Sequence, residues 1–70
     1  MHPVVGRFIE VTEQDAKMFE DAALNIDALV PHLVGDAQKS DWNARAEHYR
    51  ARAKELRAIL DKVRAQDWAQ

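Results

Sequence analysis

Apolar residues recur at alternating intervals of four and three positions in two long stretches of the chain. This heptad spacing places them along one side of an α-helix, at the positions called a and d, where the helix can pack lengthwise against another. The first stretch contributes Ala16, Phe19, Ala23, Ile26, Val30 and Leu33, and the second contributes Trp42, Ala46, Tyr49, Ala53, Leu56, Leu60 and Val63. The pattern predicts an all-α fold built from two helices that pack along their length.

The first helix is predicted over residues 13–34. Thr12 is a good N-cap, because its hydroxyl can accept a hydrogen bond from a free amide of the first turn, and acidic residues follow it. Near the other end, Pro31 lacks an amide hydrogen and disfavours helical geometry at Val30, so the helix should end or kink there. Gly35 then suits the position just beyond the last turn.

The second helix is predicted over residues 41–66, which contain neither glycine nor proline and are rich in strong helix formers. Ser40 and Asp41 are both suitable N-caps. Residues 1–11 are rich in β-branched and aromatic side chains and include a proline and a glycine, so we expect an extended arm or a short strand there. The chain is thus predicted to be one domain, an antiparallel two-helix hairpin with an N-terminal arm.

Charged residues beside the core positions predict how the two helices align. Position e of the first helix holds Glu13, Glu20 and Asp27, and position e of the second holds Arg50, Arg57 and Arg64. A short connection makes the helices antiparallel, and in antiparallel pairs e faces e. One register brings together Asp27 with Arg50, Glu20 with Arg57 and Glu13 with Arg64, and it also pairs Phe19 with Leu56 and Ile26 with Tyr49. An external polyanion is the other explanation for the arginines.

The opposite edge of the hairpin carries apolar residues that two helices cannot bury. They are Met18, Ala22, Leu24 and Leu29 on the first helix and Ile59 on the second. Such a surface predicts a protein partner. The simplest partner is a second copy, which would form a four-helix bundle with twofold symmetry. If the arm instead folded over this edge, the chain would be a monomer.

Trp68 lies beyond the last heptad, at the open end of the predicted hairpin. We expect it to cover Phe8 or Val5 and so to hold the arm in place. Direct contact between Trp68 and a partner is the alternative interpretation.

Composition is consistent with a chain that gains stability by association. Seventy residues form a single core of marginal size, and the absence of cysteine removes disulfides and thiolate metal sites. A second chain that binds the folded state would stabilise it. No secretory leader or membrane span is expected, so the sequence indicates a cytoplasmic protein.

Nucleic acid is the alternative ligand, because the second half of the chain is basic although the whole chain has a net charge of −2. Arg45, Arg52 and Lys54 could follow phosphates along one side of a bundle. Acidic residues interrupt this basic surface, however, and no exposed aromatic side chain is expected to stack on bases. RNA binding is therefore the second hypothesis.

No catalytic or metal-binding pattern is present in the sequence. His2, His32 and His48 are too scattered for a metal site, and the few hydroxyl residues are better explained as helix caps. We therefore expect no cofactor and no enzymatic activity. The predicted function is that of a protein–protein interaction module, a small homodimeric regulator, inhibitor or assembly factor.

Overall fold

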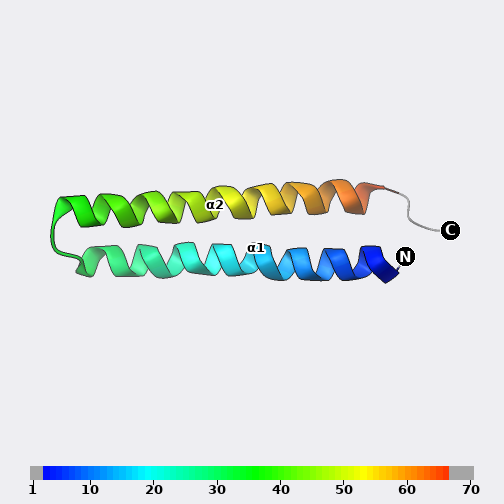
Figure 1. The fold of residues 1–70 in the computed structure, drawn as a ribbon, viewed down its shortest axis with the longest axis horizontal. Helices are drawn as coiled ribbons and strands as arrows, with labels where there is room; N and C mark the ends of the chain where they lie inside the picture. Colours follow the sequence, from blue (N-terminus) through cyan, green and yellow to red (C-terminus); the bar gives the residue numbers. More distant parts are fainter. Residues whose placement is uncertain (1–2, 67–70) are drawn as a thin grey trace.

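The computed structural model describes residues 3–66, which form two long antiparallel helices lying side by side (Figure 1). Helix α1 spans Pro3–Leu29, a single 3-10 turn (η1) covers Val30–His32, and helix α2 spans Asp36–Ala65. No strand occurs within residues 3–66. The molecule is a rod with Cα extents of 57 × 14 × 12 Å. The predicted all-α hairpin is therefore confirmed.

The extended N-terminal arm was a wrong prediction, because residues 3–11 are the first turns of α1. Pro3 suits the start of a helix, where its missing amide hydrogen would have no partner anyway. The heptad pattern continues upstream, since Val5 and Ile9 are half-buried and Thr12 is only 7% exposed. Packing of this apolar side outweighs the weak helix propensity of its β-branched residues. Thr12 consequently lies inside the helix and is not its N-cap.

The connection between the helices is shorter than predicted. Pro31 ends α1 as expected, and the amide of Leu33 donates to the carbonyl of Val30 at 3.1 Å, which closes the 3-10 turn. The backbone then reverses at Gly35, whose φ of 97° is a conformation that L-residues with a side chain rarely adopt. Because the reversal occurs there, α2 can begin at once at Asp36.

Ser40 and Asp41 therefore lie within α2 and do not cap it. The amide of Lys39 donates to the carbonyl of Gly35 at 3.2 Å, which begins the hydrogen-bond ladder of the helix. Asp36 lies in the first turn, where its negative charge interacts favourably with the helix dipole.

The core is correctly placed by the heptads but is thin. Every predicted a and d residue is buried or half-buried. The buried apolar residues are Ala16, Ala23, Ile26, Ala46, Ala53, Leu56 and Leu60. Most of them are alanines, and Leu60 is the one large side chain within residues 3–66 that is fully buried. The four buried alanines all occupy a positions, where Leu60 is an exception, so most of the large apolar side chains between the helices lie at d.

Phe19 does not pair with Leu56 as predicted. The rings of Phe19 and Tyr49 stack with centroids 5.8 Å apart and planes 24° from parallel, whereas the predicted partner of Phe19 was Leu56. The early start of α2 explains this shift. Phe19 and Tyr49 are equally distant in sequence from Val34, which lies between the two helices, so the shorter connection brings these two residues to the same level.

Gly35→Ala tests the role of the positive φ. The added methyl group would meet no atom within 4 Å, so its cost comes from the backbone alone. We expect a loss of about 1–3 kcal/mol in the free energy of unfolding, measured by urea titration with circular dichroism. The control is Val34→Ala, which changes an exposed neighbour and should have little effect. Equal midpoints for the two variants would contradict the assigned backbone conformation.

Candidate functional site: the two edges of the hairpin

One edge of the hairpin is closed by ion pairs between the helices. Arg50 Nη1 lies 2.9 Å from Asp27 Oδ2, and Arg57 Nη2 lies 2.7 Å from Glu20 Oε1. Arg57 Nε also donates to Glu20 Oε2 at 3.1 Å, which makes this pair bidentate. The third pair joins Arg64 to Glu13. All three predicted pairs are confirmed.

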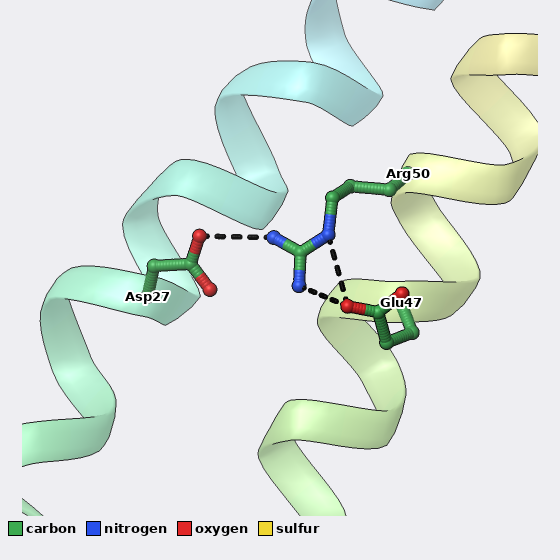
Figure 2. A network of polar contacts seen from close by, with 3 residues as sticks. All are labelled: Asp27, Glu47 and Arg50. Carbon is green, nitrogen blue, oxygen red and sulfur yellow. Dashed lines mark hydrogen bonds and ion pairs between the residues drawn. The ribbon is translucent and has the colours of Figure 1, made fainter.

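Arg50 is held by carboxylates from both helices (Figure 2). Its guanidinium reaches Asp27 across the interface, while its Nη2 lies 2.6 Å from Glu47 Oε1 within α2. The hydrogen bond to Glu47 is the largest cause of a raised pKa for Arg50, and burial opposes it in part. These contacts hold the Arg50 guanidinium between the two helices.

The ion pairs survive the shift in core register because the side chains are long. A helical side chain leans toward the N-terminus of its own helix. In antiparallel helices the two partners of a pair therefore lean toward each other along the axis. Glu20 and Arg57 can meet in this way although their Cα atoms are at different levels.

The contribution of these pairs to stability depends on pH. The hydrogen bond from Arg57 lowers the pKa of Glu20, with burial acting in the opposite direction. The contribution of Glu20 is therefore present above its unfolded pKa of about 4.3, and it is lost as the pH falls through the lower folded-state pKa. Since both side chains are more than two-fifths exposed, solvent screens the pair. The ladder orients the helices more than it stabilises them.

The basic residues proposed for nucleic acid do not form a continuous surface. Arg52 Nη1 lies 3.0 Å from Glu55 Oε2, and the guanidinium of Arg45 lies 4.3 Å from the centre of the Trp42 ring. Lys54 is at position b, roughly 160–180° around α2 from these two g-position arginines. Their charges are thus divided between different sides of the helix.

The expectation that no aromatic side chain is exposed was wrong. Phe8 is 44% exposed on α1, and Trp42 is only half-buried. A surface hollow beside Trp42 is lined by Trp42, Ala44, Arg45, His48 and Tyr49. The Arg45 guanidinium already covers one ring there, which reduces the surface that remains for stacking.

The other edge carries a second apolar heptad pattern on α1. It occupies positions c and g, and its apolar members are Val4, Phe8, Val11, Met18, Ala22 and Leu29. We call these six residues the outer stripe. Five of the eight large apolar side chains that are exposed within residues 3–66 belong to it, and Ala22 is half-buried. A hollow beside Met18 and Ala22 is otherwise lined by polar residues, namely Gln14, Lys17, Asp21 and Asn25.

The sequence-based prediction found only half of the outer stripe. Met18, Ala22 and Leu29 lie on it as expected. Val4, Phe8 and Val11 were missed because residues 1–11 were interpreted as an extended arm. The signal was present, since these three residues continue the same alternating spacing upstream.

The remaining predicted interface residues lie in different places. Ile59 is 40% exposed at a g position of α2, on the same side of the hairpin as Leu29. Leu24 is exposed at position b, roughly 160° around α1 from the g positions, and so is not part of the outer stripe. Trp68 lies outside the described residues, and so does its expected contact with Phe8 or Val5.

Within residues 3–66, no group of three or more histidine and carboxylate side chains is arranged to hold a metal ion. Neither helix in that part of the chain is long and apolar enough to cross a membrane. Comparison with protein-family models, with curated proteins and with solved structures found no match. The function must therefore be argued from the two edges of the hairpin.

Charge reversal tests the ion-pair edge. Arg57→Glu should lower the urea midpoint, because it places two acids together, and adding Glu20→Arg should restore part of the loss. The effect should be small, as both partners are partly exposed. Arg52→Glu is the matched control, since Arg52 is paired within α2 and Glu20→Arg should not rescue it. Additive effects of Arg57→Glu and Glu20→Arg would show that the two side chains are not coupled.

Proposed function

We propose that this protein is a non-enzymatic protein–protein interaction module, acting as a small homodimeric regulator, inhibitor or assembly factor. Its binding surface is the outer stripe of α1, extended by Ile59 of α2. The observation that carries the proposal is the concentration of exposed apolar side chains on one side of α1. Exposed apolar side chains gathered on one side of a helix are typical of a site that another chain covers.

The shape of the hairpin supports association. Its Cα radius of gyration is 16.2 Å, whereas a compact chain of the same length has about 11 Å. Two helices form a single layer, so each helix leaves most of its circumference in water. Since the buried residues are mainly alanines, the gain from burial within one chain is limited. Covering the outer stripe would add the large side chains that the core lacks.

A four-helix bundle made from two hairpins is the form of association that we favour. In such a bundle the helix at the contact between the two hairpins packs against two neighbours, which requires two apolar sides on that helix. Helix α1 has both, because the a/d residues face α2 and the outer stripe faces solvent. The ion-paired edge remains on the outside of such a bundle.

Nucleic-acid binding is less well supported. The described arginines at the ion-paired edge have acidic partners in the same chain, and Arg52 is paired with Glu55. A phosphate would have to compete with these carboxylates. RNA binding is therefore the less favoured function, and the size-exclusion experiment can distinguish it from dimerisation.

Leu29→Asp and Ile59→Asp test the proposed surface. Light-scattering mass on a size-exclusion column should give about twice 8.0 kDa for the native chain and 8.0 kDa for either variant, because each places a charge in an apolar contact. Leu24→Asp is the matched control: it makes the same chemical change at a more exposed residue on another side of α1, and should leave the mass unchanged.

A native chain that runs as a monomer, or variants with the mass of the native dimer, would contradict the homodimer. Absorbance at 260 nm, recorded on the same column, distinguishes the alternative. A peak rich in nucleic acid that disappears in high salt and after Arg45→Ala with Arg52→Ala would replace the proposal with RNA binding.

A further inference from the structure

We infer that the outer stripe of α1 binds the outer stripe of a second copy, with the two α1 helices antiparallel and Met18 on the twofold axis. This inference rests on the proposed function and specifies the partner, the helix and the register. In this dimer the two α1 helices make the contact, and α2 lies at the margin of the interface.

The position of the outer stripe on α1 allows this contact. At 100° per residue, the centre of the stripe lies roughly 100° around the helix from the centre of the a/d side that faces α2. A helix lying on the stripe would therefore stand beside α1 without colliding with α2. That angle is close to the right angle between the two neighbours of each helix in a four-helix bundle.

The pattern of the stripe selects one antiparallel register. With Met18 opposite Met18 of the partner subunit, Phe8 lies opposite Leu29 of the partner subunit. Val11 then faces Asn25 of the partner subunit, and Asp15 faces Ala22 of the partner subunit. Every large apolar residue of the stripe from Phe8 to Leu29 is covered, and Asp15, the charged residue of the stripe, does not meet its own copy.

The other alignments of the two α1 helices bury charge or leave apolar side chains uncovered. A shift of one heptad toward the N-terminus, or a parallel alignment, would place Asp15 opposite its own copy in an apolar contact, where two carboxylates repel each other. A shift of one heptad in the other direction would place Phe8 opposite Asp36 of the partner subunit, beyond the end of α1, and so leave Phe8 uncovered. The two polar positions of the stripe, Asp15 and Asn25, thus specify the register.

The exposed area also fits a second copy. A compact chain of 8.0 kDa exposes about 4,500 Å², whereas this chain exposes 5293 Å². The difference is on the order of the 800 Å² that each partner contributes to a standard interface. Stacking a second hairpin on the outer stripe would remove an area of about this size from water.

Cysteine cross-linking tests the register directly, because the chain has no cysteine of its own. A residue on a twofold axis meets its own copy, so Met18→Cys alone should form a disulfide-linked dimer under mild oxidation in most of the protein. Ala28→Cys and Ala51→Cys provide controls at exposed f positions of α1 and α2, and should give only traces of dimer. A short bis-maleimide repeats the test without requiring disulfide geometry.

Phe8 and Leu29, which face each other away from the twofold axis, give a second test of the register. Phe8→Cys and Leu29→Cys should each cross-link poorly alone and efficiently when the two variants are mixed, since the register joins one to the other. Circular dichroism of each variant confirms that the helices are retained, as all five substituted residues are exposed.

The outcomes separate the register from the proposed function. A native dimer in which Met18→Cys does not cross-link, or in which the controls cross-link equally, overturns the register and leaves the homodimer standing. A native chain that is a monomer at every concentration overturns both. A dimer with selective cross-linking at Met18 and at the mixed Phe8 and Leu29 pair supports the inference.

Discussion

The close packing of two helices through small side chains is the constraint on which the rest of this structure depends. Alanines at most a positions allow α1 and α2 to approach along their whole length. The same choice leaves the hairpin with little apolar volume of its own, so most of the large apolar side chains other than Leu60 are found at d and on the outer stripe. The thin core and the exposed apolar side of α1 are therefore two consequences of one arrangement.

The core restricts the alignment of the helices along their axis more narrowly than the ion pairs do. Rings such as Phe19 and Tyr49 stack only when their levels match, so they report the position of the turn at Gly35. Long charged side chains can span several residues along the axis because they lean toward one another. The ladder of Glu20 with Arg57 and its neighbours therefore specifies which edges face each other, and the connection specifies the register of the core.

Much of the fold followed from sequence periodicity, because the a/d pattern depends only on the spacing of apolar residues. The errors arose where a local signal was preferred to that pattern. Thr12 and the caps Ser40 and Asp41 resemble helix starts, yet the heptad continues through Val5 and Ile9, and the backbone reverses at Gly35. The stacking of Phe19 on Tyr49 could not be predicted, because it depends on the length of the connection. Half of the outer stripe was not predicted, because residues 1–11 were interpreted as an extended arm.

The two helices differ in what they offer on the apolar side of the hairpin, and this difference argues for contact through α1. At c and g positions α2 carries Arg45, Arg52 and Glu55, and Ile59 is its one large apolar residue there. The corresponding positions of α1 are mainly apolar. In the proposed dimer the α1 helices would form an apolar centre and the charged side of α2 a solvated rim, which is the usual anatomy of a specific interface. A charged rim also disfavours addition of a third hairpin, since its charges would lose water without gaining partners.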